Sequence, residues 1–417
     1  MHWAKRYDCV CFLDRSRHPH PEDSLFAVDS LTEIVVQEGT DGFEELKHYY
    51  NQHKDWLFGY LSYDLKNEIE DLESNNPDFV GLPLLHFFQP RFLFQIGPKQ
   101  ITVSYPTDLY APTEIDAIFD DIRHHETVPP VAPPALKVHP RISKEKYLTT
   151  IAQLKKHIHE GDIYEINFCQ EFFAKNAPIE PTSTYERLFE ISPTPFSCYY
   201  RKDHHHLMCG SPERFLRKRG NTILSQPIKG TAPRGKTKAE DHALREALRH
   251  SKKDRSENVM IVDLVRNDLS RTAKKGTVQV DELFGIYTFP QVHQMISTVS
   301  SQLREDIHFI DAIKAAFPMG SMTGAPKIRA MELIETYESS KRGLYSGSVG
   351  YISPEGDFDL NVVIRSILYN AVDEYLSFIV GGAIIDQSNA ESEYEECLLK
   401  ASAILKTLQV EAFEESA

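Results

Sequence analysis

The sequence of 417 residues lacks the features that mark exported or membrane-spanning proteins. No stretch approaches the roughly 20 consecutive apolar residues that a helix needs to cross a bilayer. The N-terminal segment MHWAKRYDCVCFLDRSRH carries charge throughout and has no apolar core of the kind found in signal peptides. We therefore expect a protein that is neither exported nor inserted into a membrane.

Cysteine is also scarce. The chain has 6 cysteines, and they are scattered except for Cys9 and Cys11. The Cys-x-Cys spacing is not that of a zinc finger, and no second pair accompanies it. This pattern is typical of buried or incidental thiols in a reducing compartment, so we expect a cytoplasmic protein.

Basic residues are outnumbered, with 46 Lys+Arg against 61 Asp+Glu and a formal net charge of −15. Such a chain is poorly suited to partners held mainly through phosphate contacts, so we expect neither a nucleic-acid nor a membrane-surface partner. A small anionic substrate is still compatible with this charge, because a few local cations or a metal ion outweigh the mean field. The content of 41% hydrophobic and 26% charged residues is ordinary for a globular protein and excludes global disorder.

Proline is concentrated in one region, residues 124–146, which holds five prolines. Such a run cannot sustain a helix or a central strand and favours an extended connector. We interpret residues 126–142 as a proline-rich linker. It would separate an N-terminal region, residues 1–125, from a C-terminal region, residues 143–410.

Hydrophobic periodicity indicates the secondary structure of the C-terminal region. Residues 148–158 have helical spacing and Gly161 stands where a left-handed cap belongs, whereas residues 163–173 alternate like a strand. Ser388 and Glu391 are predicted to form a capping box at the start of the last helix. Strands and helices do not alternate regularly, so we predict an α+β fold with largely antiparallel sheets. Further helices are predicted at 239–252, 256–266, 309–316, 326–338 and 389–408.

One lysine lies in an unusual backbone setting. Lys229 stands between Pro227 and Gly230 in the segment QPIKGT, which is otherwise apolar or hydroxylic. A lysine in a partly desolvated site has a lowered pKa and can act as an amine nucleophile or a base. Glu213, in the preceding segment SPERF, is a candidate carboxylic acid. The alternative interpretation is an exposed lysine in a turn.

Two predicted helices carry acidic pairs. Asp254 and Glu257 lie one helical turn apart, and Glu393, Glu396 and Lys400 form one line along another helix. Carboxylates from two helices suit Mg²⁺, which prefers oxygen ligands. The alternative is a solvated helix face with an ordinary Glu396–Lys400 pair.

Two glycine-containing segments could approach a ligand. The segment PMGSMTGAPK fails the Walker pattern because only three residues separate Gly320 from Gly324. It reads instead as a turn that leads into a helix with Pro326 near its start, which presents free N–H groups to an anion. Gly381 and Gly382 let the backbone approach a ligand closely, or form a bulge.

Together these segments resemble the chorismate-utilising enzyme family, which includes anthranilate synthase component I, aminodeoxychorismate synthase component I, isochorismate synthase and salicylate synthase. The matching segments follow family order and comprise GDIYEINFCQ from 161, SPERF from 211, PIKGT from 227, ENVMIVDLVRNDLSR from 257, GSMTGAPK from 320, RGLYSGSVGY from 342, Arg365, VGGAII from 380 and EYEECLLK from 393. The segment GYLSYDL from 59 resembles the family's N-terminal region. The resemblance implies an anthranilate synthase component I-like fold, in which two large, mainly antiparallel β-sheets pack as a sandwich with flanking helices.

Two positions divide the family by reaction. Aminodeoxychorismate synthases resemble this chain in carrying lysine at Lys229, where other members usually have alanine. Water-using members carry a lysine base where this chain has Glu165, which also differs from the glutamine common in ammonia-using members. The resemblance therefore implies a component I that converts chorismate and ammonia into 4-amino-4-deoxychorismate, for 4-aminobenzoate and folate synthesis. The ammonia would come from glutamine through a partner amidotransferase. Anthranilate synthase component I is the alternative.

The resemblance also implies roles for individual residues. Lys229 would attack C2 of chorismate while the C4 hydroxyl leaves, with Glu213 as general acid and base. Mg²⁺ would bind Glu257 and Glu396 directly, and Asp254 and Glu393 through water.

Substrate contacts are implied in the same way, for Ser321, Tyr345, Arg365, Gly381, Gly382 and Lys400. One position departs from the family pattern. Relatives usually have histidine directly before the leucine of an H-L-x-S motif, whereas this chain has Gln294 there and His293 one residue earlier.

Overall fold

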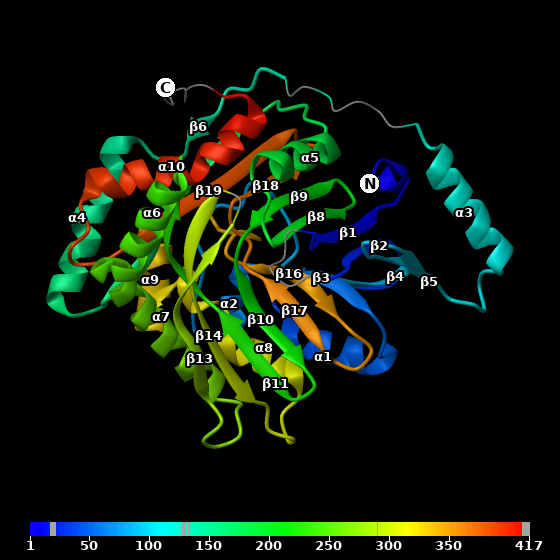
Figure 1. Cartoon of the computed structure of the whole chain (residues 1–417), viewed down its shortest axis with the longest axis horizontal. Coiled ribbons are helices and arrows are strands. Elements are labelled where there is room, and N and C mark those ends of the chain that lie inside the picture. The colour runs from blue at the N-terminus through cyan, green and yellow to red at the C-terminus, as the bar shows by residue number, and fades with distance from the viewer. Residues whose placement is uncertain (17–21, 127–130, 132–133, 290, 411–417) are drawn as a thin grey trace.

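The computed structural model describes residues 1–16, 22–126, 131, 134–289 and 291–410 (Figure 1). Part of the predicted linker, including Pro129, Pro130 and Pro133, lies outside the described residues. Strands of the predicted N-terminal region pair directly with strands of the C-terminal region. The two regions are therefore hydrogen-bonded to each other.

The strands form one continuous network of antiparallel pairs. Their bounds are β1 (Cys9–Asp14), β2 (Ser24–Val36), β3 (Leu57–Leu61), β4 (Leu85–Ile96), β5 (Ile101–Ser104), β6 (His139–Pro140), β7 (Glu165–Ala174), β8 (Phe196–Lys202), β9 (His205–Ser211), β10 (Arg214–Arg219), β11 (Thr222–Gln226), β12 (Ile228–Pro233), β13 (Gln279–Thr288), β14 (Val292–Gln302), β15 (Gly324–Ala325), β16 (Ser348–Ile352), β17 (Phe358–Asn361), β18 (Ser366–Asn370) and β19 (Tyr375–Ile384).

The network has two portions joined by the long strands β2 and β4. One portion runs β7–β19–β18–β9–β8–β1–β2, and the other runs β4–β3–β16–β17–β10–β11–β14, with β12 and β13 both on β14. A buried cluster between the portions draws side chains from both, among them Cys11, Tyr200 and Leu368 from the first, and Phe58 and Tyr351 from the second. The predicted sandwich of mainly antiparallel sheets is thereby confirmed.

Helices cover both outer faces of this sandwich and close one edge (Figure 1). The helices α5 and α10 pack on the first portion, α3 packs against β4, α1, α7 and α8 pack on the second portion, and α4 and α9 lie beside β7. Within the described residues, no helix is long and apolar enough to cross a bilayer. The bounds are α1 (Gly42–His53), α2 (Lys66–Ile69), α3 (Pro112–His124), α4 (Lys144–Glu160), α5 (Pro181–Ile191), α6 (Lys238–His250), α7 (Lys252–Ser270), α8 (Phe309–Ala316), α9 (Lys327–Tyr337) and α10 (Ala390–Leu408), with 3-10 turns η1 (His2–Arg6), η2 (Tyr63–Leu65) and η3 (Gly320–Met322).

Local capping explains where the helices that bear acidic residues begin. The hydroxyl of Ser251 accepts a hydrogen bond from the Asp254 N–H and starts α7. At α10 the cap is Asn389, whose side chain accepts from the Ser392 N–H. The predicted capping box of Ser388 and Glu391 is therefore wrong. The Ser388 hydroxyl instead accepts from the Ile385 N–H and closes the preceding turn, and asparagine serves as well as serine at a helix start.

Candidate active site

The two acidic helices face each other. Asp254 and Glu257 lie on α7, and Glu393 and Glu396 lie on α10. Lys253, in the first turn of α7, places its Nζ 3.9 Å from Oε1 of Glu257 and 3.9 Å from Oε1 of Glu393. One ammonium therefore spans the gap between carboxylates of both helices.

Lys229, on β12, reaches into the same region. Its Nζ donates a hydrogen bond of 2.8 Å to Oε1 of Glu165 on β7, and the exposed side-chain fractions are 11% for Lys229 and 2% for Glu165. This burial excludes an exposed lysine in a turn. Desolvation acts to lower the pKa of Lys229, but Glu165, Glu257 and Glu213 outweigh it and hold the pKa above its usual value. The predicted lowering is therefore wrong for the substrate-free protein.

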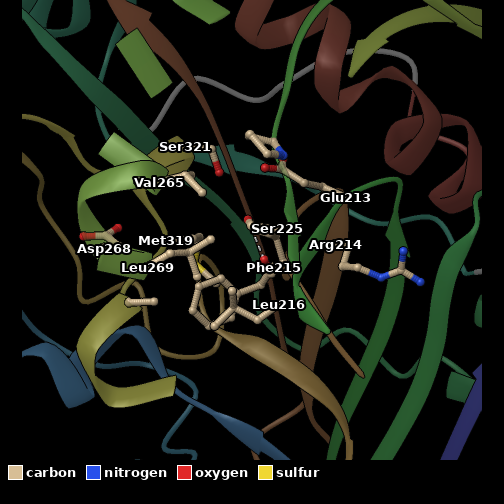
Figure 2. Close-up of a pocket in the computed structure, with 14 residues that line it drawn as sticks. Glu213, Arg214, Phe215, Leu216, Ser225, Val265, Asp268, Leu269, Met319 and Ser321 are labelled. Carbon is tan, nitrogen blue, oxygen red and sulfur yellow. Dashed lines mark hydrogen bonds between the residues drawn. The ribbon is translucent and has the colours of Figure 1, made fainter. Parts of the chain in front are cut away.

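Glu213 lies directly before β10 and is buried. Desolvation raises its pKa to about 7, against the lowering effects of the Ser321 hydroxyl, Lys229, the Ile228 N–H and Arg365. Figure 2 shows Glu213 and Ser321 together at one end of a pocket whose opposite wall is apolar, formed by Phe215, Leu216 and Met319 among others. A carboxyl group with a pKa near 7 exchanges a proton readily at neutral pH, as a general acid and base must.

Glu257 and Glu393 are the two buried carboxylates of the acidic pairs. Desolvation raises the pKa of Glu257 to about 7, although Lys229 and Lys253 act to lower it. Its Oε1 is buried and accepts no hydrogen bond from the described residues. A buried carboxylate oxygen without a donor is costly unless a cation or another donor satisfies it. Carboxylates from two facing helices are the donor set that Mg²⁺ prefers, so the residues present fit that ion.

Asp254 is held in place by the segment that contains Lys229. Gly230 has a left-handed φ of 91°, and a Cβ built there would lie 2.9 Å from Cβ of Asp254. The absence of a side chain at Gly230 therefore allows β12 to pack directly on the first turn of α7. This contact brings the lysine and the acidic helix together.

Glu396 is paired within its own helix. Lys400 Nζ lies 2.9 Å from Oε1 of Glu396 and donates a hydrogen bond of 2.9 Å to the Gly381 carbonyl. Desolvation acts to raise the pKa of Glu396, but Lys400 outweighs it and the pKa is lowered. The Glu396–Lys400 pair considered as an alternative does form, at the margin of the acidic cluster.

The two glycines of β19 have different surroundings. A Cβ on Gly382 would lie 3.4 Å from Oε2 of Glu393 and 3.6 Å from Nζ of Lys400, so Gly382 leaves space beside the charged groups. A Cβ on Gly381 would lie 2.2 Å from the Phe168 carbonyl oxygen, so Gly381 is required where β19 packs on β7.

The predicted substrate-binding residues Tyr345 and Arg365 differ in their surroundings, because Tyr345 contacts a cysteine and Arg365 forms no ion pair with the described residues. The Tyr345 hydroxyl lies 3.6 Å from Sγ of Cys169, the residue that pairs with Gly381 across the sheet. Arg365 has a left-handed φ of 52°, rare for a residue with a side chain. Desolvation lowers the pKa of Arg365, an effect that Glu213 opposes, and the described residues form no ion pair with its guanidinium. A desolvated, unpaired guanidinium suits a carboxylate ligand.

Lys253 was not singled out from the sequence, whereas Glu165, His293 and Gln294 were noted only as departures from the family pattern. Lys253 could have been found from its i,i+4 spacing to Glu257. The contact of Glu165 with Lys229 has no local signal. Gln294 is buried, and its Nε2 has no hydrogen-bond partner among the described residues, whereas both ring nitrogens of His293 are bonded, to Thr288 and Asp241.

A second group of metal-type side chains lies elsewhere, on β1, β2 and β4. Glu33 accepts hydrogen bonds of 3.2 Å from Cys9 and from His86. Lys202 contacts both carboxylate oxygens of Glu33, at 3.1 and 3.2 Å. The charge of Glu33 is thus already balanced, and we interpret this group as a closed hydrogen-bond network.

Comparison with known proteins assigns the family. A family model described as chorismate binding enzyme matches residues 15–406. The chain belongs to this chorismate-binding family. Aminodeoxychorismate synthase component 1 of Escherichia coli is 40% identical over 268 residues, which are 64% of this chain and 58% of that protein. Aminodeoxychorismate synthase of Streptomyces griseus is 38% identical over 367 residues, 85% of this chain and 50% of that protein. The chain spans less than two thirds of the length of both relatives.

A solved structure has the same fold. The crystal structure of anthranilate synthase component I from Streptococcus pneumoniae matches with a TM-score of 0.82 and 26% identity, over 92% of each chain. The predicted anthranilate synthase component I-like fold is therefore confirmed. Since this family is described as one of chorismate-binding enzymes, the chain is a member of an enzyme family.

Proposed function

We propose that this enzyme is an aminodeoxychorismate synthase component I, which converts chorismate and ammonia into 4-amino-4-deoxychorismate. The observation that carries the proposal is the position of Lys229, a buried amine within one cluster that also holds Glu213 and the acidic helices. The names of the relatives from Escherichia coli and Streptomyces griseus support the same reaction.

The reaction begins with removal of a proton from Lys229. Glu165, whose Oε1 lies 2.8 Å from the ammonium, is within reach to accept it. The free amine attacks C2 of the ring, the ring double bonds shift, and the C4 hydroxyl leaves as water with a proton from Glu213.

The second half reverses the covalent step. Ammonia attacks C4 of the adduct, the double bonds shift back, and the bond between C2 and Lys229 breaks. Glu213 takes the proton that the incoming ammonia releases, and Lys229 takes its proton back from Glu165. The apolar wall beside Glu213 favours the neutral acid, which is the form needed to expel the hydroxyl.

Mg²⁺ would be held by Glu257 and Glu396, with Asp254 and Glu393 through water, and when bound it would neutralise a substrate carboxylate. The orphaned Oε1 of Glu257 supports this assignment. The enolpyruvyl carboxylate of the substrate would meet Tyr345 and Arg365, with help from Gly381, Gly382 and Lys400. The hydroxyl of Ser321 would approach the substrate.

The ammonia would come from glutamine through a separate amidotransferase subunit. Support comes from the name of the Escherichia coli relative, which is a component 1. We further propose that the product serves 4-aminobenzoate and folate synthesis in the cytoplasm, where the six unpaired cysteines would remain reduced.

The proposal is tested with purified protein, chorismate, Mg²⁺ and ammonium. We expect a product that becomes 4-aminobenzoate only after a lyase is added. Direct release of fluorescent anthranilate would instead identify an anthranilate synthase component I and refute the proposal. Repetition with glutamine and a candidate amidotransferase tests the partner.

The role of Lys229 is tested with Lys229→Ala, which should abolish product formation. Lys252→Ala removes an exposed lysine of α7 as a control and should leave the rate unchanged. Near-normal turnover by Lys229→Ala would refute the covalent mechanism.

A further inference from the structure

Lys253 is the ammonium that joins the two acidic helices. Within the described residues, Lys229 is bonded to Glu165 and Lys400 to Glu396. Lys253 instead contacts one carboxylate of α7, Glu257, and one of α10, Glu393. Both of these carboxylates are buried, so their mutual repulsion is only weakly screened by solvent.

The contacts of Lys253 are loose. Both N···O distances are 3.9 Å, longer than a hydrogen bond, and 51% of the Lys253 side chain is exposed. A long, half-exposed lysine side chain can move its charged end into solvent without disturbing its helix. The ammonium therefore occupies the space between the carboxylates reversibly.

A divalent cation would need the same carboxylates. Oε1 of Glu257, which lies 3.9 Å from Nζ of Lys253, is also the buried oxygen that accepts no hydrogen bond from the described residues. An ammonium at 3.9 Å and a metal ion bound to this oxygen would repel each other strongly. The two cations must exclude one another.

We propose that Lys253 is a built-in counter-ion, which holds the acidic faces of α7 and α10 together in the metal-free protein and yields its place to a divalent cation. The inference rests on the metal role in the proposed function. It predicts that Lys253 weakens metal binding and at the same time stabilises the metal-free protein.

The test compares Lys253→Met with Lys252→Met. Both variants remove one positive charge from the first turn of α7. Lys252 is exposed, and within the described residues it forms no ion pair with the four acidic residues of the two helices. The probe is Mn²⁺, titrated into protein stripped with EDTA and followed by the electron paramagnetic resonance of the free ion. We expect Lys253→Met to bind Mn²⁺ about 2- to 30-fold more tightly than Lys252→Met, the equivalent of two weak ion pairs.

The second measurement is thermal unfolding in EDTA. Lys253→Met should melt at a lower temperature than Lys252→Met, and Mn²⁺ should reverse the difference. Equal Mn²⁺ affinity in the two variants, or equal melting in EDTA, would overturn the inference.

A separate outcome distinguishes failure of the proposed function. If neither the wild-type protein nor Lys252→Met binds Mn²⁺, the metal role is refuted for the native chain. If Lys253→Met nevertheless binds Mn²⁺, this result would still support the inference that Lys253 excludes the divalent cation. No binding by any variant would overturn the inference as well.

Discussion

The ion pair of Lys229 and Glu165 makes a sharp prediction for Glu165→Gln. The substitution keeps the shape of the side chain and an oxygen that can accept from Lys229, but it removes the negative charge 2.8 Å from the ammonium. Glu165 is the largest contributor to the raised pKa of Lys229. The substitution therefore isolates one electrostatic cause.

The magnitude follows from the geometry. An opposite charge within hydrogen-bond distance of a buried group changes its pKa by about 1–3 units. We expect the pKa of Lys229 to fall in Glu165→Gln, because desolvation remains while the largest influence that raises this pKa is removed. Glu257 and Glu213 remain nearby and continue to raise the pKa of Lys229 in the variant.

The sign of the effect on stability is also determined. A lysine whose pKa is raised by folding stabilises the folded state below its unfolded pKa of about 10.4, and this stabilisation is lost as the pH rises through the folded value. Glu165→Gln should therefore be less stable than the wild type at neutral pH, and the difference should shrink in alkaline solution.

The assay is competitive labelling of lysines with acetic anhydride in EDTA over a series of pH values. Mass spectrometry of the peptide that contains Lys229 reports its pKa, and exposed Lys252 in the same sample is the internal reference. A pKa of Lys229 that is unchanged by Glu165→Gln would refute the electrostatic account of the site.

Three further variants test other parts of the site. Glu213→Gln should lower the rate by about 10²–10⁴-fold and change the pH–rate profile near pH 7, and a rate equal to that of the wild type would exclude Glu213 as the general acid. Gly230→Ala should cost about 1–3 kcal/mol of unfolding free energy, because its φ is 91° and its Cβ would press on Asp254; denaturation at the wild-type midpoint would contradict this. Gly382→Ala should lose less than about 1 kcal/mol of unfolding free energy, because its Cβ would lie 3.4 Å from Oε2 of Glu393. The variant should nevertheless have a raised KM for chorismate, and an unchanged KM would show that Gly382 does not line the substrate site.

Much of the secondary structure could be predicted from the sequence. The helix predicted at 309–316 has these bounds in the structure, and the predicted Gly161 cap ends α4 with a φ of 85°. Apolar periodicity and capping depend on residues close together in the sequence, so helices can be predicted from them. The start of α7 was missed by four residues, since its first turn is charged and has no apolar period.

The candidate site was only partly predictable. The spacing of Glu393 and Glu396 places them on one line of a helix in any fold that keeps the helix. That this line faces Glu257 depends on how α7 and α10 pack on different portions of the sandwich. Lys253 shows that the acidic residues of α7 and α10 lie close together, because it contacts one carboxylate of each helix.

The sequence by itself determined the family-specific motifs, their order and most helices, because each depends on residues close together in the chain. Only the tertiary structure decided the direction in which the pKa of Lys229 is shifted. The sequence predicted a lowered pKa from desolvation alone, whereas Glu165, which lies 64 residues away along the chain, reverses the direction. Electrostatic energy depends on distance through space and on burial, and neither can be counted along a sequence.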